Sequence, residues 1–148
     1  MKKWLIPIVL VAACGGGGSE VVGLSGVISA GLGLQPGILK FYDDSVLIDV
    51  PQSATVGNPV MIAVKTYGGG CITRGETRLT HSGLSVEIAP FDKVTDPGPQ
   101  GACTDDLRIF EHDVVVVFDT PGSANVVIQG REWPKNREFS RELRIAVQ

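Results

Sequence analysis

The octapeptide VMIAVKTY, residues 60–67, decides the fold that this sequence predicts. One set of its alternate residues is Val60, Ile62, Val64 and Thr66. Because successive side chains of an extended strand point to opposite faces, this pattern places one face on an apolar core. The stretch therefore predicts a half-buried β-strand rather than a helix, in which apolar residues would recur every three to four positions.

Short β-forming runs of the same kind precede and follow this strand, and turn residues separate them. They are residues 38–42, 46–50, 72–80, 84–91, 107–118, 124–130 and 139–147. The run 72–80 is polar and predicts an edge strand, whereas no segment has the periodicity of an amphipathic helix. We therefore expect seven or eight short strands, with a long loop over residues 92–106.

The apolar residues of the run 107–118 change from one alternate set to the other along its length. The first set is Leu107 and Ile109, and the second is Val114, Val116 and Phe118. Both sets can face the core only if one extra residue shifts the strand, so the pattern predicts a β-bulge near Glu111–His112. Val115 and Val117 make the second half apolar on both faces, which predicts a central strand.

This number and spacing of strands predicts an all-β fold, an antiparallel β-sandwich. Over residues 38–148 the chain resembles an immunoglobulin-like or fibronectin type III-like module, through strand number and spacing rather than through a motif. It departs from a true immunoglobulin domain, which has a tryptophan between its two cysteines, because Trp133 follows both Cys71 and Cys103. A small β-barrel is the alternative fold.

The composition is that of a folded, weakly acidic chain. Hydrophobic residues make up 43% of the 148 residues, which excludes an intrinsically disordered protein. The formal net charge is -3, without blocks of charge, and argues against nucleic-acid binding, which needs a basic face to replace phosphate counterions. No apolar run approaches the roughly 20 residues that a helix needs to span a bilayer. The length suits one domain and a tail.

The N-terminal end of the sequence has the order of a secretory signal. Two lysines follow the initial methionine, residues 4–13 are apolar, and Ala12-Ala13 leads directly into Cys14. This end resembles the lipobox of bacterial lipoproteins, with Val11 where that family usually has leucine. The resemblance implies that residues 1–13 are removed and that Cys14 carries several acyl chains, such as palmitate, which anchor it to a membrane. An ordinary signal peptide or a buried N-terminal strand would not explain a cysteine followed by four glycines.

The chain is accordingly divided into three parts. They are a signal peptide (1–13), a lipidated cysteine with a glycine-rich tether (14–37) and a β-sandwich domain (38–148). A loose edge strand within residues 20–37 is the alternative to a tether, since apolar residues are interleaved with the glycines there. In well-studied lipoproteins an aspartate after the cysteine retains the protein at the inner membrane. Gly15 stands at that position, so the resemblance favours the outer membrane.

Cys71 and Cys103 remain as a pair once Cys14 is assigned to the signal. An even number of cysteines in an exported chain predicts a disulfide. Two free thiols or two metal ligands are the alternative, although no CxxC or nearby CxxH spacing supports a metal. The bond would tie the far end of the long loop.

The sequence offers polar candidates for a metal site but no spacing that defines one. The candidates are His81, His112, Asp92, Asp96, Asp105, Asp106, Glu111 and Asp113. Asp105 and Asp106 are better explained as a turn or strand cap. We therefore assign no metal ligand and expect no cofactor.

No catalytic constellation is evident either. Ser82 follows His81 directly, which does not make a nucleophile and base pair, and no GxSxG elbow occurs. The glycine triplets lack the GK[ST] of a phosphate loop. We assign no catalytic residue and expect a protein that is not an enzyme.

The most basic part of the chain lies near its C-terminal end. Its cations are Arg131, Lys135, Arg137, Arg141 and Arg144, and they are interleaved with Glu132, Glu138 and Glu142. Ion pairing within or across strands explains the pattern, and a weak contact with an anionic surface such as lipid headgroups is the alternative.

The expected function is non-catalytic binding or scaffolding at the cell envelope, with the membrane held through Cys14 and an envelope protein as the partner. A periplasmic metal- or small-ligand-binding protein is the alternative, and an envelope hydrolase comes third. Exposed aromatic residues on one sheet face, such as Tyr67 with Phe91, would favour the binding module. Convergence of His81 and His112 with carboxylates would favour a metal.

Overall fold

The computed structural model describes residues 33–42 and 46–148, and this part of the chain is built from β-strands. The strands are β1 (Leu34–Pro36), β2 (Ile38–Phe41), β3 (Ile48–Asp49), β4 (Ser53–Ala54), β5 (Pro59–Gly68), β6 (Ile72–Ser82), β7 (Ser85–Val94), β8 (Arg108–Glu111), β9 (Val114–Val117), β10 (Gly122–Trp133) and β11 (Arg137–Val147). The predicted all-β class is confirmed. The described residues contain no helix with the length and hydropathy to cross a membrane.

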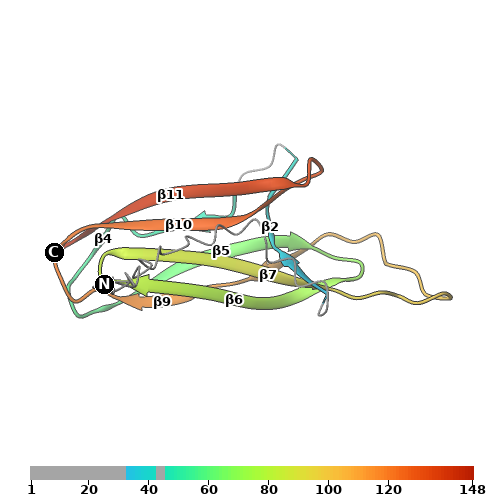
Figure 1. Cartoon of the computed structure of the whole chain (residues 1–148), viewed down its shortest axis with the longest axis horizontal. Coiled ribbons are helices and arrows are strands. Elements are labelled where there is room, and N and C mark those ends of the chain that lie inside the picture. Colours follow the sequence, from blue (N-terminus) through green and yellow to red (C-terminus); the bar gives the residue numbers. More distant parts are fainter. Residues whose placement is uncertain (1–32, 43–45) are drawn as a thin grey trace, which may run out of the picture.

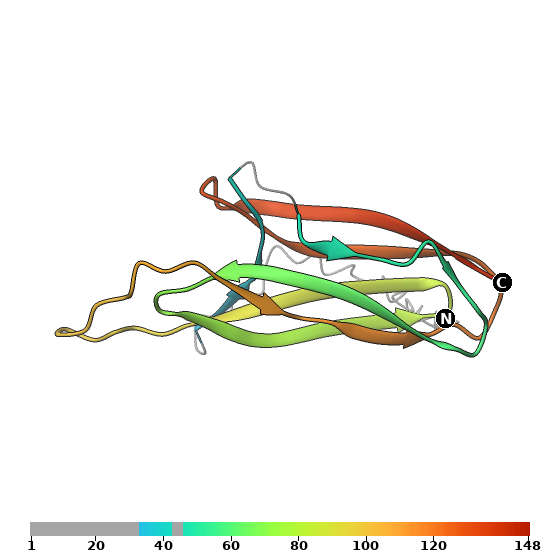
Figure 2. The same ribbon diagram turned by 180° about the vertical axis from the view of Figure 1, so that it is seen from behind.

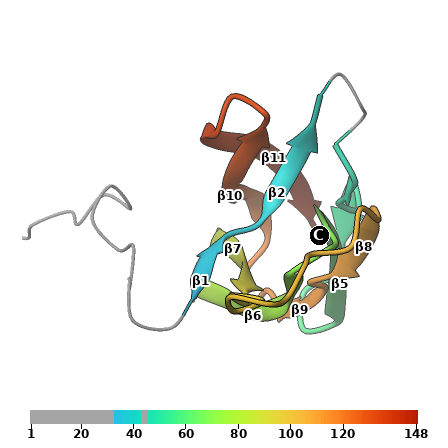
Figure 3. The same ribbon diagram turned by 90° about the vertical axis from the view of Figure 1, so that its right-hand side faces the viewer.

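The strands form one mixed sheet that curls into a half-barrel (Figure 3). Its main path runs β1-β7-β10-β2-β5-β3, while β11 pairs with β10 and β4, β6 with β7, and β8 and β9 with β5. Figure 1 shows the hairpin β10–β11 lying over a layer that contains β5, β6, β7 and β9. The predicted edge position of residues 72–80 is confirmed, because β6 pairs only with β7 among the described strands.

The prediction of a purely antiparallel sheet is wrong. β10 runs parallel to both β2 and β7, and β11 runs parallel to β4. The segment of β1 and β2 passes from β7 to β10 at Gly37, which brings β2 beside β10. The Gly37 amide donates to the Pro90 carbonyl at 2.9 Å, and the Gly37 carbonyl accepts from the Arg131 amide at 2.9 Å. A Cβ atom at Gly37 would overlap the Thr66 side chain, so only glycine fits this crossing.

The core lies inside the curl, and the octapeptide 60–67 contributes to it as predicted. Val60, Ile62, Val64 and Thr66 are all buried. The three apolar side chains among them belong to a layer that also includes Leu39, Val86, Ile88, Phe118, Val126, Ile128 and Ile145.

The predicted β-bulge near Glu111–His112 is wrong. Ile62 pairs with Val114 and Lys65 with Glu111, so β5 keeps one register across β9 and β8. The inward position between the two strands is filled by His112, a polar residue that an apolar pattern overlooks. Leu107 and Ile109 consequently face outward, with exposed fractions of 56% and 52%. The expected burial of the second half on both faces is also wrong, since Val115 is 59% exposed.

Two predicted boundaries also change. Leu34–Pro36, assigned to the tether, forms β1 on β7, so the paired sheet begins before residue 38. The strand predicted over residues 124–130 is longer at both ends, because β10 runs from Gly122 to Trp133. The signal peptide 1–13, Cys14 and the tether up to residue 32 lie outside the described residues.

Candidate functional site

The most prominent surface feature is the long loop between β7 and β8, here called the stapled loop and comprising residues 95–106. It projects beyond both layers at the end of the molecule opposite the C-terminus (Figures 1 and 2). All its residues are exposed except Gly98 and Asp106, which are half-buried. Exposed loops on a rigid β scaffold are common sites of recognition.

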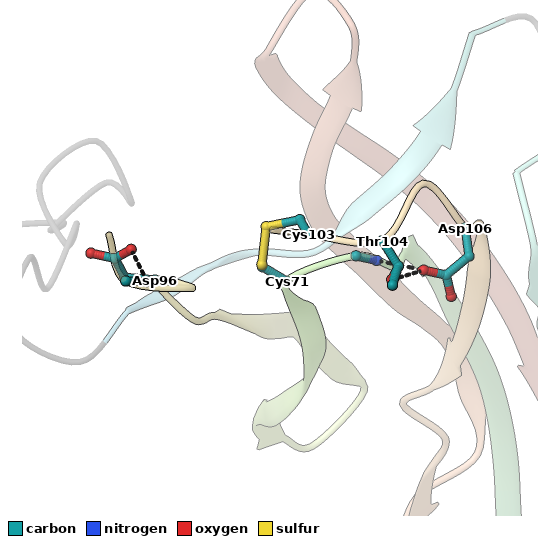
Figure 4. The surroundings of a disulfide bond; sticks show 7 residues. Cys71, Asp96, Cys103, Thr104 and Asp106 are labelled. Atoms are coloured by element: carbon teal, nitrogen blue, oxygen red, sulfur yellow. Dashed lines mark hydrogen bonds between the residues drawn. A yellow bond between two sulfur atoms is a disulfide. The ribbon is translucent and has the colours of Figure 1, made fainter. Parts of the chain in front are cut away.

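A disulfide between Cys71 and Cys103 ties this loop to the start of β6, as predicted (Figure 4). The two Cα atoms are 5.0 Å apart, within the range that a disulfide requires. The Cys71 carbonyl also accepts a hydrogen bond from the Thr95 amide at 2.9 Å. The start of the loop at Thr95 and its far side at Cys103 are therefore both joined to Cys71, and these residues form the stem of the loop.

Asp106 closes the other side of the stem, in the capping role predicted for it. Its Oδ1 accepts from the Gly70 amide at 3.1 Å and from the Thr104 hydroxyl, and its Oδ2 accepts from Arg108 Nε. These bonds, the one from Thr104 first, lower the pKa of Asp106 from 3.8 to about 2, so the cap is ionised at neutral pH. Gly69 has φ 129°, and a Cβ there would overlap the Asp106 carbonyl.

The tip of the stapled loop also has internal order. Asp96 Oδ1 accepts from the Gly98 amide at 2.9 Å, and the Gly101 amide donates to the Gly98 carbonyl at 3.2 Å. Pro97 and Pro99 fix their own φ angles. A loop restrained in these ways loses less conformational entropy when a partner binds it, which makes it suited to recognition.

The two histidines do not converge, so the arrangement that would favour a metal is not formed. His81 is exposed, donates a hydrogen bond from Nε2 to the Gly83 carbonyl, and lies edge-on to Phe118. Across residues 33–42 and 46–148, no group of three or more His, Cys, Asp or Glu side chains could hold a metal ion.

His112 instead joins a chain of hydrogen bonds that the sequence analysis missed. Its Nδ1 lies 2.9 Å from Thr77 Oγ1, and its Nε2 lies 3.2 Å from Asp92 Oδ1. The order Thr, His, Asp is that of a nucleophile, a base and an orienting carboxylate. However, His112 is 0% and Asp92 1% exposed, which encloses the base and the carboxylate. The hydrogen-bonded residues Thr77, His112 and Asp92 therefore connect β6, β7 and the segment between β8 and β9. The sequence did hold one sign of this, because position 112 falls in the same alternate set as the buried Val114 and Val116.

The predicted basic cluster is divided by the fold. The side chain of Glu132 is 4% exposed and forms three ion pairs. Its carboxylate oxygens lie 3.3 Å from Lys40 Nζ, 3.4 Å from Lys135 Nζ and 2.5 Å from Arg137 Nε. The hydrogen bond from Arg137, followed by those from the lysines, lowers the pKa of Glu132 from 4.5 to about 2. The ion-pairing interpretation therefore accounts for Lys135 and Arg137.

The remaining cations of that cluster lie elsewhere. Arg131 is half-buried, donates to Asn136 Oδ1 at 3.0 Å, and has a pKa lowered by its burial. Arg141 and Arg144 lie further along β11, opposite Ile128 and Asn125.

The exposed aromatic pair expected from Tyr67 and Phe91 is not present, because both side chains are buried. Tyr67 stacks on Phe41, with ring centroids 5.5 Å apart. Among the described residues, the exposed aromatic side chains are instead Tyr42 and Trp133, at the adjoining ends of β2 and β10.

An open hollow of about 540 Å³ lies at the far side of the molecule from the stapled loop. Its lining includes Asp49, Ala54, Asn58, Pro59 and Met61, from β3, β4, β5 and the turn before β5. Met61 is largely exposed and pairs with Val115, another exposed apolar residue, so the β5 side of the hollow adjoins an apolar surface.

No protein-family model, no curated protein and no solved structure matches this chain. Among the described residues, the stapled loop combines exposure with preorganisation, and it is the candidate binding site.

Proposed function

We propose that this chain is a lipid-anchored protein of the bacterial cell envelope whose all-β domain is a non-catalytic binding module. The observation that carries the binding function is the stapled loop, which is exposed along its length and restrained at its stem and its tip. The proposal uses only the all-β architecture and does not depend on an immunoglobulin-like topology.

The anchoring half of the proposal rests on the lipobox-like residues 1–14. In a bacterial host grown with labelled palmitate, the wild-type chain should incorporate the label and lose residues 1–13. The variant Cys14→Ala should do neither. Mass spectrometry that finds an unmodified Cys14 in the mature wild-type protein would contradict lipid anchoring. Separation of the two membranes on a density gradient then tests the expected outer-membrane location.

The binding half is tested with variants of the stapled loop. Gln100→Lys changes the exposed tip, whereas Thr120→Lys places the same charge in the exposed turn between β9 and β10, at the other end of the molecule. Tagged wild-type protein and Thr120→Lys should retain the same envelope protein in an affinity capture, and Gln100→Lys should retain much less of it. Equal capture by all three proteins would exclude the loop tip as the binding site.

A periplasmic small-ligand-binding protein is the second candidate, and the hollow of about 540 Å³ favours it. A ligand that occupied the hollow should raise the melting temperature of the wild-type protein but not that of Met61→Arg, whose longer, charged side chain would obstruct the hollow. A screen of small amphiphiles by thermal shift, with both proteins side by side, makes this comparison.

A further inference from the structure

The hollow of about 540 Å³ is bordered by two strand edges that have no neighbouring strand among the described residues. Over residues 59–62, β5 pairs with β9 on one side only, because β3 reaches no further than Asp49, opposite Ala63. β4 pairs with β11 alone. Residues 53–55 of the first segment and 59–61 of the second line the hollow, together with Gln148, at the end marked C in Figure 2.

The backbone of Met61 points to the unpaired side of β5. The Lys65 amide donates to the Leu47 carbonyl, on the side of β3, at 3.0 Å. The Val64 carbonyl accepts from the His112 amide, on the opposite side, at 2.7 Å. Since alternate residues of a strand direct their backbone groups to the same side, Met61 directs its N–H and C=O groups to the side of β3, as Lys65 does.

No strand takes up these groups of Met61. The register that pairs Asp49 with Ala63 would place Pro51 opposite Met61. However, β3 ends at Asp49, and proline has no N–H to donate. No backbone hydrogen bond joins Met61 to Pro51, and both residues line the hollow. The N–H and C=O groups of Met61 are therefore available to a ligand there.

β4 presents a second set of backbone groups to the hollow. The Ala54 carbonyl accepts from the Gln148 amide at 2.9 Å, so Ala54 faces β11. Its neighbours Ser53 and Thr55 direct their backbone groups to the opposite side, and both line the hollow. The Thr55 carbonyl accepts from the Asn58 amide at 3.1 Å. The N–H and C=O of Ser53 and the N–H of Thr55 are left for a ligand.

Asp49 supplies the charge of the hollow. Among the described residues that line it, Asp49 alone has a charged side chain, and that side chain forms no hydrogen bond or ion pair with another described residue. Lys65 is paired with Glu111 at 3.3 Å. Because Asp49 pairs with Ala63, it lies on the same face as Met61 and about 7 Å further along the strand. A basic side chain on a peptide paired with Met61 would be within reach of this carboxylate.

We propose that the hollow binds a short extended segment of a partner polypeptide, which pairs with the free backbone groups of Met61 and places a lysine or arginine beside Asp49. Addition to a strand edge gives affinity through the main chain, and side-chain contacts give specificity. Pro51 and Pro59 interrupt the edge, so the segment is short rather than a full strand. No cationic side chain lies among the lining residues to bind a terminal carboxylate, which favours an internal segment.

This inference rests on the proposed binding function only in that the domain binds a polypeptide. It depends neither on the anchor nor on the stapled loop. It goes beyond the proposed function by placing a second contact at the other end of the domain and by naming the chemistry of the segment that fits there.

The inference is tested with a library of random heptapeptides displayed on phage and selected on the full chain in lipid nanodiscs. The enriched sequences should carry lysine or arginine. Synthetic copies with acetylated and amidated ends and a fluorescein label should bind in an anisotropy titration. Asp49→Asn should weaken this binding about threefold or more, as expected for an ion pair near the surface. A selection that enriches no peptide, or binding that requires a free amino terminus, would overturn the inference.

The matched control is Asp119→Asn, which removes an exposed carboxylate that does not line the hollow. This variant should bind the selected peptides as the wild type does. Replacement of the basic residue of the peptide by norleucine should weaken binding to the wild type but cause little further loss with Asp49→Asn, because both changes remove the same ion pair. Equal effects of the two aspartate variants would contradict the contact with Asp49.

Pairing through the main chain is tested on the peptide, where the folding of the protein is not at risk. Each backbone nitrogen of the selected peptide is methylated in turn, which removes one N–H donor. Methylation of a nitrogen that pairs with the strand edge should weaken binding about fivefold or more. Tolerance of methylation at every position would show that side chains alone hold the peptide and would contradict strand addition.

Failure of this inference is distinguishable from failure of the proposed function. Affinity capture with Gln100→Lys concerns the stapled loop and reports the proposed function alone. Peptides that bind Met61→Arg as well as the wild type lie outside the hollow and overturn the inference. An amphiphile that raises the melting temperature of the wild type but not of Met61→Arg, with no peptide enriched, retains the hollow as a ligand site and overturns the polypeptide as its occupant.

Discussion

At the scale of single residues, buried polar side chains do much to connect the strands. His112 occupies an inward position between Phe110 and Val114 that a regular apolar pattern would give to a hydrophobic residue. There it bonds Thr77 on β6 and Asp92 on β7, so one ring connects the junction of β8 and β9 to the β6–β7 hairpin. A buried polar group is tolerated only when it is hydrogen-bonded, which gives each member of the chain a structural role.

We expect His112→Ala to destabilise the fold by about 3 kcal/mol. The substitution removes the partner of the buried Asp92 carboxylate and leaves a cavity, and both effects act in the same direction. His81→Ala is the matched control, because His81 is exposed and its loss should change the free energy of unfolding by less than about 0.5 kcal/mol. Urea unfolding followed by fluorescence measures both, and equal midpoints for the two variants would contradict this role of His112.

Glu132 makes the stability dependent on pH. Its pKa is about 2 in the folded protein and ordinarily 4.5, so its ionised form is favoured by folding. This contribution is fully present above about pH 4.5 and is lost as the pH falls through about 2. The melting temperature of Glu132→Gln should therefore lie below that of the wild type at pH 7 and approach it near pH 2. A difference that stays constant from pH 7 to pH 2 would show that the charge of Glu132 has no part in it.

At the scale of elements, the stapled loop depends on the segment that precedes β6. Glycines at positions 69 and 70 adopt positive φ angles of 129° and 61°, which side chains rarely allow, and so turn the chain toward the loop. This turn presents the Gly70 amide to Asp106 and places Cys71 opposite Cys103. The disulfide and the cap thus both follow from one glycine-rich turn.

Replacing Cys71 and Cys103 by serine together should lower the free energy of unfolding by roughly 3–4 kcal/mol. The bond closes a segment with a sequence separation of 32, and a cross-link of that span restricts the unfolded chain by about this amount. The sheet itself should remain, because its core lies away from the loop. Denaturation of the wild type with and without reductant should reproduce the difference, and peptide mapping that finds either thiol free in oxidised protein would contradict it.

At the scale of the whole molecule, stability comes from the apolar layer within the curled sheet. Fourteen buried hydrophobic residues form one cluster, to which β2, β5, β7, β9, β10 and β11 all contribute. Because these side chains come from strands throughout the described chain, the hairpins share one core. We therefore expect the domain to unfold as a unit.

The fold should not require a metal ion. Removal of divalent ions with EDTA should leave the melting temperature within about 1 °C, because the apolar cluster supplies the core without a ligand. Addition of zinc or calcium to the treated protein serves as the control. A loss of many degrees with EDTA, restored by one equivalent of either ion, would overturn this expectation and our assignment of the polar residues.

The sequence by itself determined the strands and much of the stapled loop. Strict alternation in residues 60–67 specified which side chains of β5 are buried, since the period of a strand is a local property of the chain. The pairing of Cys71 with Cys103 was predicted once Cys14 was assigned to the expected signal, since two cysteines then remained, and this needed no knowledge of the fold. The role of Asp106 as a cap was likewise predictable from its place beside a turn.

Only the tertiary structure decided how the strands associate. The parallel pairs of β10 with β2 and β7 join segments distant in the sequence, and no local periodicity encodes which strands become neighbours. The same holds for the Thr77–His112–Asp92 chain, whose members lie 20 and 35 positions apart and meet only when the sheet curls. Residue patterns report the environment of one strand at a time, whereas topology depends on which strands can share a core, and that is a property of the folded chain as a whole.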